Sequence, residues 1–164
     1  MAIKDFFQRD HREIDGLYRA ALEQAKSGAT EAALRTYDQY ERFLERHIVW
    51  EETLLFPAFE EATEFKEGGP TQVMREEHRR IRAFKAELRA HLATLKGPAP
   101  PTHPLWEASR ALVEVLGDHN RKEEAILYPM CDRSLSPFLR EKILRQVEEE
   151  KGEPAPARAR TDCC

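Results

Sequence analysis

Hydrophobic residues recur at three- and four-residue steps along most of the chain, which is the spacing of one face of an α-helix. Glycine and proline are sparse and cluster between these periodic stretches. The pattern predicts four long helices, at about residues 3–26, 30–64, 71–95 and 104–130. A shorter fifth helix is expected from about residue 136 to residue 150. No stretch shows the strict alternation that is typical of a β-strand.

The ends of the predicted helices carry residues that favour or prevent helical turns. Gly28 follows the first helix and is typical of a C-terminal cap, and Thr30 is expected to cap the second helix. Pro57 lies inside the second helix, where a proline removes a hydrogen bond and collides with the preceding turn. We therefore expect a kink or a break near the end of that helix.

The connections between the long helices are short, so helices that follow one another should run in opposite directions. The predicted fold is all-α, an antiparallel up-down-up-down four-helix bundle with a short fifth helix. Residues 1–150 are expected to form this single domain. Residues 151–164 are rich in proline, alanine and arginine and are expected to be a disordered C-terminal tail.

Charge and composition exclude several classes of protein. The 164 residues include 26 lysines and arginines and 30 aspartates and glutamates, interleaved along the chain, for a net charge of −4. This balance predicts an ordinary solvated surface, with neither nucleic acid nor a membrane as a partner. No apolar run approaches the roughly 20 residues of a membrane-spanning helix, and the three cysteines do not make a disulfide framework. We therefore expect a cytoplasmic protein.

An internal repeat divides the chain into two similar halves. Residues 47–57 and 119–129 align without a gap, and both follow the pattern H-x-x-x-E-E-x-x-L-F/Y-P. Upstream of them, residues 10–14 and 77–81 share the pattern D/E-H-R-x-I. One histidine–glutamate pair would arise by chance in a chain with six histidines, but two pairs with matching flanks indicate a shared role.

The repeated histidines and glutamates are expected to face the interior of the bundle. A residue four positions on lies beside the first on a helix, so the histidine and the first glutamate of each longer motif project together. The histidine of each shorter motif lies on an apolar stripe and should also point inward. The predicted metal ligands are His11, His47, Glu51, His78, His119 and Glu123.

Two glutamates that face each other in an apolar core are costly unless a cation neutralises them. A pair of metal ions would do so, with Glu51 and Glu123 bridging the ions and two neutral imidazoles bound to each ion. Nitrogen and oxygen ligands suit iron, manganese or zinc, and the lack of thiolates argues against a structural zinc site. The alternative is that the histidines are ordinary core residues with satisfied hydrogen bonds.

In the order of these motifs the chain resembles the hemerythrin-like, or HHE cation-binding, domain over about residues 5–132. The resemblance implies a four-helix bundle that holds a non-haem di-iron centre, in which an oxo or hydroxo group and two carboxylates bridge the two Fe ions. Zn or Mn would be possible substitutes for Fe. The resemblance also implies that the six residues named above are the ligands.

Two departures from the oxygen-carrying hemerythrins bear on function. Those proteins have a further histidine one turn before the one that matches His78, where this chain has Met74. They also have an aspartate five residues after the last helix's histidine, where this chain has Glu123 at four. With one imidazole fewer, each ion would have an open position unless a nearby side chain fills it. Open positions favour reaction or sensing over reversible oxygen carriage.

These features lead to three hypotheses about function. The first is a module that responds to or reacts with O2, NO or peroxide, in redox or gas sensing or in iron homeostasis, and that passes a signal to a protein partner. The second is an enzyme, namely a di-iron peroxidase, an oxidase or a nitric oxide reductase. The third is reversible oxygen binding or iron storage. In each case the site would bind small ligands, including anions.

Several other residues near the motifs have predicted roles. Tyr18, Tyr40 and Lys85 share the ligand stripes. We expect the tyrosines to pack in the core and the lysine to lie at the boundary of the core. Glu52 and Glu124 are expected to be solvated or to accept hydrogen bonds from ligand histidines.

Two further histidines are excluded as metal ligands. His91 is rotated away from the stripe of His78, and His103 lies in a proline-rich connection. Both are expected to be exposed to solvent. Cys131 is expected to be a small buried thiol.

Overall fold

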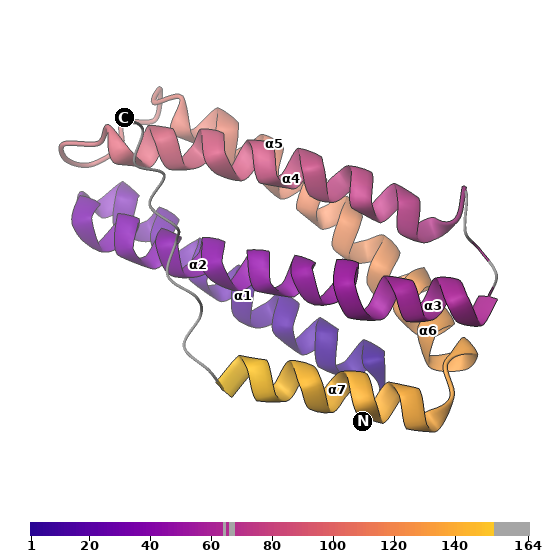
Figure 1. The fold of residues 1–164 in the computed structure, drawn as a ribbon. Coiled ribbons are helices and arrows are strands. Elements are labelled where there is room, and N and C mark those ends of the chain that lie inside the picture. The colour runs from indigo at the N-terminus through magenta and orange to yellow at the C-terminus, as the bar shows by residue number, and fades with distance from the viewer. Residues whose placement is uncertain (64, 66–67, 153–164) are drawn as a thin grey trace, which may run out of the picture.

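The computed structural model describes residues 1–63, 65 and 68–152, and this part of the chain contains helices and no β-strand (Figure 1). The α-helices are α1 (Ile3–Ser27), α2 (Thr30–Trp50), α3 (Phe56–Thr63), α4 (Pro70–Ala93), α5 (Leu105–Lys122), α6 (Tyr128–Ser134) and α7 (Pro137–Gly152). Two π-helical turns, η1 (Glu51–Leu55) and η2 (Glu123–Leu127), join α2 to α3 and α5 to α6. The predicted all-α class is confirmed.

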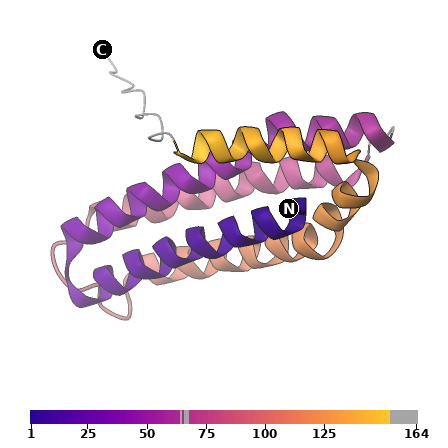
Figure 2. The same cartoon turned by 90° about the horizontal axis from the view of Figure 1, so that it is seen from below.

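The helices form two long pairs that lie side by side. α1 packs along α2, and α4 packs along α5. The pairs meet through contacts of α2 with α4 and of α1 with α6, so helices from both halves of the repeat enclose the interior (Figure 1). α7 packs against α1 on the outside, near the N-terminus (Figure 2).

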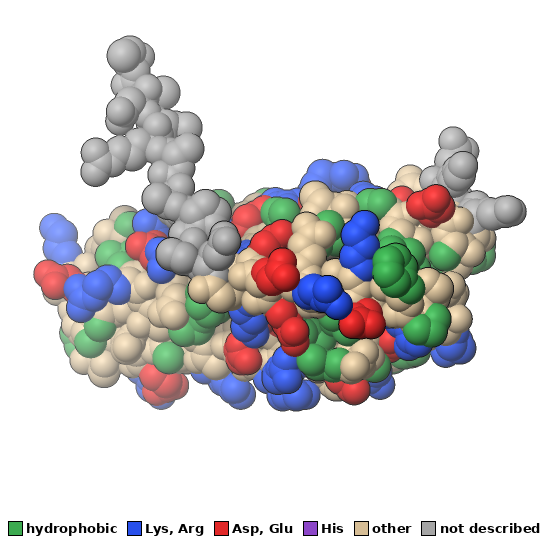
Figure 3. All heavy atoms as spheres, turned by 60° about the horizontal axis from the view of Figure 1, so that its bottom comes forward, with side chains coloured by type: hydrophobic (Ala, Val, Ile, Leu, Met, Phe, Trp, Pro, Cys, Tyr) green, Lys and Arg blue, Asp and Glu red, His purple; other side chains and the backbone are tan. Residues whose placement is uncertain are grey.

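The surface of the bundle carries charges of both signs. Lysine and arginine side chains are mixed with aspartate and glutamate side chains over the face drawn in Figure 3. Within the part of the chain that the structure describes, no helix has both the length and the apolar character that crossing a membrane requires.

The turn between α1 and α2 contains one confirmed prediction and one wrong one. Gly28 ends α1 in the left-handed conformation, with φ 87°, and its N–H bonds to the carbonyl of Ala25. A Cβ at this position would lie 2.8 Å from the ring of Pro98, so only glycine fits. Thr30 is not the N-terminal cap, because Ala29 takes that position and Thr30 is already the first residue of α2.

Near Pro57, where a kink or a break is predicted, the helix has a π-helical turn and no break. In η1 the N–H of Phe56 bonds to the carbonyl of Glu51, five residues earlier, and η2 repeats this bond with Tyr128 and Glu123. The wider turn moves the preceding carbonyls away from the proline ring, so the helix continues. The same turn occurs in both halves because both carry a proline at this point of the repeat.

Most helix ends lie within a few residues of their predicted positions. The fourth predicted helix extends through α6 to Ser134, and α7 includes residues 151–152, which the composition assigns to the tail. The rest of the predicted tail, at 153–164, and the predicted end of the second helix, at residue 64, lie outside the described residues.

Two apolar clusters fill the bundle on either side of a polar layer. One contains Ile14 of α1 and Ile81 of α4, and the other contains Phe7 of α1 and Met74 of α4. Along both helices a histidine of the repeat lies between the two clusters. The apolar side chains keep water away from both sides of this layer, which lowers the local dielectric constant and strengthens electrostatic interactions there.

Candidate metal centre

The six residues predicted as metal ligands come together in this polar layer. His11 lies on α1, His47 on α2, Glu51 on η1, His78 on α4, His119 on α5 and Glu123 on η2. Each of them is at most 4% exposed. Their nitrogen and oxygen atoms form two groups within 4.8 Å, one made of His11, His47 and Glu123 and the other of Glu51, His78, His119 and Glu123.

The four imidazoles face each other in pairs through their Nε2 atoms. Nε2 of His11 is 3.0 Å from Nε2 of His47, and Nε2 of His78 is 3.2 Å from Nε2 of His119. Two nitrogen ligands that lie about 2.1 Å from one ion are roughly 3.0 Å apart at a right angle and about 3.4 Å apart at the tetrahedral angle. Both pairs therefore have the spacing of two ligands on one ion.

Each histidine is held by a carboxylate on the other side of its ring. The pairs, measured from Nδ1, are His47 with Asp10 at 2.9 Å, His119 with Glu77 at 3.1 Å, His78 with Glu52 at 2.9 Å and His11 with Glu124 at 2.9 Å. A carboxylate accepts the hydrogen bond, so we assign the ring proton to Nδ1. In the neutral rings each Nε2 then carries a lone pair that points into the layer. Two such lone pairs face each other in each imidazole pair, and a metal ion or a proton between them would remove the repulsion.

These carboxylates follow the sequence repeat. Within each half, the acid directly before the first histidine holds the second histidine, and these acids are Asp10 and Glu77. The acid after the ligand glutamate reaches across to the other half, and these acids are Glu52 and Glu124. The expectation that Glu52 and Glu124 bond to histidines is confirmed. Asp10 and Glu77 were not expected to take part, although an acid at this position in both halves was a signal for them.

The two ligand glutamates each face both histidine pairs. Oε2 of Glu51 is 3.7 Å from Nε2 of His47 and 3.3 Å from Nε2 of His78. Glu123 spans the other two histidines with both of its oxygens, since Oε2 is 3.4 Å from Nε2 of His11 and Oε1 is 3.1 Å from Nε2 of His119. This is the arrangement that carboxylates need in order to bridge two ions.

One oxygen of each ligand glutamate lacks a hydrogen-bond partner. Both glutamates are fully buried, and with the imidazoles neutral no donor among the described residues bonds to Oε2 of Glu51 or to Oε1 of Glu123. A buried carboxylate oxygen without a partner is costly, and a bound cation removes that cost. The donor set therefore fits a pair of metal ions.

Protons occupy the site when a cation does not. Burial opposes the charge of His11, but its hydrogen bonds to Glu123 and Glu124 outweigh burial and raise its pKa to about 10. For His119, burial is again outweighed, here mainly by the charge of Glu123, and the pKa rises to about 9. The pKa of Glu123 is lowered far below its ordinary value, against burial, by His119 and His11. The layer thus attracts positive charge.

Tyr128 is a site residue that the sequence patterns did not identify. Its hydroxyl donates to Oε1 of Glu51 at 2.7 Å and lies 3.0 Å from Oε2 of Glu123. It is also 3.3 Å from Nε2 of His11 and 3.4 Å from Nε2 of His47. Burial, followed by the charges of Glu123 and Glu51, raises the pKa of Tyr128 well above its ordinary value.

The π-helical turn explains why Tyr128 was missed. A residue five positions after Glu123 would lie about 140° away from it around an α-helix. In η2 the backbone instead closes from Tyr128 to Glu123, which brings the two side chains to the same face. The only signal in the sequence was the aromatic position of the longer motif.

The two tyrosines and the lysine on the ligand stripes lie where they were predicted. Tyr18 and Tyr40 pack in the apolar core, as expected, and the hydroxyl of Tyr18 lies 2.7 Å from Oγ of Ser109. Lys85 is 8% exposed and pairs with Glu45 at 2.9 Å, so it lies at the boundary of the core.

The two excluded histidines, His91 and His103, and Cys131 lie outside both groups of candidate ligand atoms. Cys131 is a buried thiol, as expected. His91 and His103 are half-buried rather than exposed, because their rings contact each other with centroids 6.1 Å apart.

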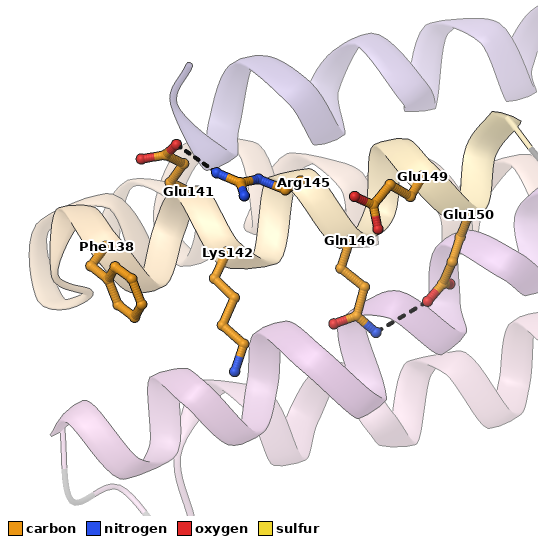
Figure 4. Close-up of a pocket in the computed structure, with 7 residues that line it drawn as sticks. All are labelled: Phe138, Glu141, Lys142, Arg145, Gln146, Glu149 and Glu150. Carbon is orange, nitrogen blue, oxygen red and sulfur yellow. Dashed lines mark hydrogen bonds and ion pairs between the residues drawn. The ribbon is translucent and has the colours of Figure 1, made fainter.

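The surface of the protein has grooves away from this centre. One runs along α7, and its lining residues, among them Phe138, Lys142 and Glu149, all belong to that helix (Figure 4). The lining contains none of the six predicted ligands. The buried layer, rather than this groove, is the candidate functional site.

Comparison with known proteins identifies the family. No curated protein sequence and no solved structure gives a match. A family model, the hemerythrin HHE cation binding domain, matches residues 2–131. The match covers most of the chain and includes all six predicted ligands and Tyr128, and the protein belongs to the hemerythrin HHE cation-binding domain family.

Proposed function

We propose that the protein binds two iron ions in the buried layer and responds to or reacts with O2, NO or peroxide there. His11 and His47 would hold one ion, and His78 and His119 the other, with both ligand glutamates between the ions. The observation that carries this proposal is the pairing of the Nε2 atoms, at 3.0 and 3.2 Å, beside two carboxylate oxygens without hydrogen-bond partners.

The donor set favours iron over a structural metal. It combines imidazole nitrogens with carboxylate oxygens, contains no thiolate and spans two ion positions, whereas structural zinc sites are closed around one ion and are rich in cysteine. Zinc or manganese would be possible substitutes. Iron would supply an exchange between ferrous and ferric states and the ability to bind small molecules.

The protein's own residues prepare the site for this chemistry. The four outer carboxylates fix the tautomer and orientation of the imidazoles and make their Nε2 atoms stronger donors. The apolar clusters exclude bulk water. Two carboxylates do not neutralise two divalent or trivalent ions, so the layer would keep a positive charge that attracts small anions.

The helix pairs fit the antiparallel up-down-up-down arrangement that the connection lengths predict.

Metal analysis tests the first half of the proposal. The protein should bind two iron ions per chain, and replacing both Glu51 and Glu123 with alanine should abolish binding. Glu148→Ala, at an exposed position of α7, is the matched control and should keep both ions. Binding of zinc in preference to iron, or retention of iron by the double variant, would contradict the proposal.

Rapid mixing tests the second half. In a stopped-flow experiment, ferrous protein should react with O2, NO or peroxide within seconds. The reaction should change its absorption spectrum. A stable oxygen adduct that releases O2 under vacuum would instead support reversible carriage. Consumption of many equivalents of peroxide per site would favour the alternative of a di-iron peroxidase.

A further inference from the structure

The two halves of the metal centre differ at the aromatic position of the repeat. The residue before the proline of the longer motif is Tyr128 in the second half and Phe56 in the first. The ring of Phe56 stacks on His78, with centroids 5.8 Å apart and an interplanar angle of 9°. Tyr128 instead places a hydroxyl beside His11 and His47. The two ion positions are therefore not equivalent.

We propose that the phenolic oxygen of Tyr128 is a ligand of the ion held by His11 and His47. This inference rests on the proposed di-iron function and deepens it. The ion at His11 would then have five protein ligands, counting both bridging glutamates, while the ion at His78 would have four. Tyr128 would thus fill the open position at the ion of His11, and the ion of His78 would keep its open position.

The distances around the hydroxyl carry this proposal. The phenolic oxygen lies between 2.7 and 3.4 Å from one ligand atom of each of Glu51, Glu123, His11 and His47. The separations from Glu123, His11 and His47, at 3.0 to 3.4 Å, are those expected among atoms bound to one ion with bonds of about 2.1 Å. The 2.7 Å contact with Glu51 is a hydrogen bond, and ligation would remove its proton. A tyrosine that served only to satisfy a carboxylate would need one of these four contacts.

The surroundings of Tyr128 fix its ring in this position. The residue is 0% exposed, and its ring packs against Phe7 and His11 with centroids 5.3 and 5.9 Å apart. The turn η2 supplies the backbone geometry that places the side chain on the same face as Glu123. Because the ring does not have to be ordered when an ion binds, little conformational entropy would oppose ligation.

Among the residues that the structure describes, no comparable group lies at the opposite position. Phe56 has no polar atom to offer, and Met74, where a further histidine would stand in an oxygen carrier, is buried in the same apolar cluster as Phe56.

In forming the bond at Tyr128, the phenolic O–H bond breaks, an oxygen–metal bond forms and the proton leaves to solvent. No electron transfer is involved in this step.

Absorption and resonance Raman spectroscopy of iron-loaded protein test the proposal. Ferrous ammonium sulfate is added without oxygen and the sample is then exposed to air, which supplies the oxidant for ferric iron. The wild type should show a visible phenolate-to-ferric charge-transfer band whose Raman ring modes shift when the protein carries ring-deuterated tyrosine. Tyr128→Phe should lose the band and the ring modes.

The matched control is Tyr40→Phe, which removes another buried hydroxyl. The hydroxyl of Tyr40 has no hydrogen-bond partner among the described residues, so this variant should keep the band unchanged. The iron content of each sample is measured alongside. If the wild type binds two irons but shows no tyrosine ring modes, or if Tyr128→Phe retains them, the ligand assignment is overturned while the di-iron proposal stands. If the wild type binds no iron, both proposals fall.

Discussion

The hydrogen bonds between imidazoles and carboxylates set the chemical state of each predicted ligand. A histidine can bind a metal only through a nitrogen that carries no proton, and the carboxylate on Nδ1 leaves Nε2 free for this purpose. The same carboxylates place negative charge around the layer, which stabilises a cation in a medium of low dielectric constant. Removing the charge of a single outer carboxylate should therefore weaken metal binding.

Glu124 is the best outer carboxylate for such a test, because it bonds to His11 and Gln8, each at 2.9 Å. Within the described part of the chain it pairs with no lysine or arginine that the substitution would leave unpaired. We expect Glu124→Gln to keep the fold and to lower metal affinity about 10- to 100-fold. Competition with a chromophoric chelator measures this. The exposed Glu148→Gln should have no effect, and an equal loss in both variants would contradict the assigned role.

The raised pKa values of His11 and His119 predict how metal binding depends on pH. With pKa values of about 10 and about 9, both rings are protonated at pH 7 when no ion is bound. Since an ion must displace these protons, affinity should rise from pH 6 to pH 9, and binding at pH 7 should release protons. Calorimetric titration in buffers of different ionisation enthalpy measures the release. Binding without proton release would show that the rings are already neutral.

At the scale of the elements, the turns place residues where a regular helix would not. The π-helical turns η1 and η2 absorb a proline in each half and bring position five onto the face of the ligand glutamate. The turn after α1 depends on Gly28, whose left-handed conformation lets the chain begin α2 two residues later and leaves room for Pro98. This turn sets how α1 and α2 meet, and both helices carry ligand histidines.

Gly28→Ala should therefore destabilise the protein, by about 1–2 kcal/mol for the left-handed backbone alone. The contact of the new Cβ with Pro98 would add to this cost. Gly16→Ala is the matched control, because Gly16 lies inside α1 with no atom within 4 Å of a new Cβ. The control should stabilise the protein by about 0.5–1 kcal/mol. Urea unfolding measures both changes, and effects of the same sign would refute the assignment.

At the scale of the whole molecule, contacts between distant segments hold the two halves around the centre. Asp132 of α6 accepts hydrogen bonds from the backbone N–H groups of Ile3 and Lys4, at 2.8 and 3.1 Å, and so caps the start of α1. Lys151 of α7 bonds to Asp10, the carboxylate that holds His47. The ion pair couples α7 to the site. Because the six predicted ligands come from six elements, bound metal should stabilise the entire bundle.

Metal removal should lower the melting temperature. An ion at a free concentration of 100 times its dissociation constant adds about 2.7 kcal/mol to the free energy of unfolding. For a domain of this size, that change raises the melting temperature by roughly 5–10 °C. Thermal unfolding with added ferrous iron and with a chelator measures the difference. The variant with alanine at both Glu51 and Glu123 should show no shift on adding iron. A shift of the same size in that variant would place the ion elsewhere.

The local periodicity of the sequence determined the helices and the six residues that meet in the layer, because positions three and four apart share a face whatever the helix packs against. Only the tertiary structure decided which acid meets which imidazole, since Glu52 with His78 and Glu124 with His11 are contacts between halves. It also decided the place of Tyr128, because a π-helical turn changes the angle around the helix axis between one residue and the next. A 3.6-residue hydrophobic pattern does not predict such a turn.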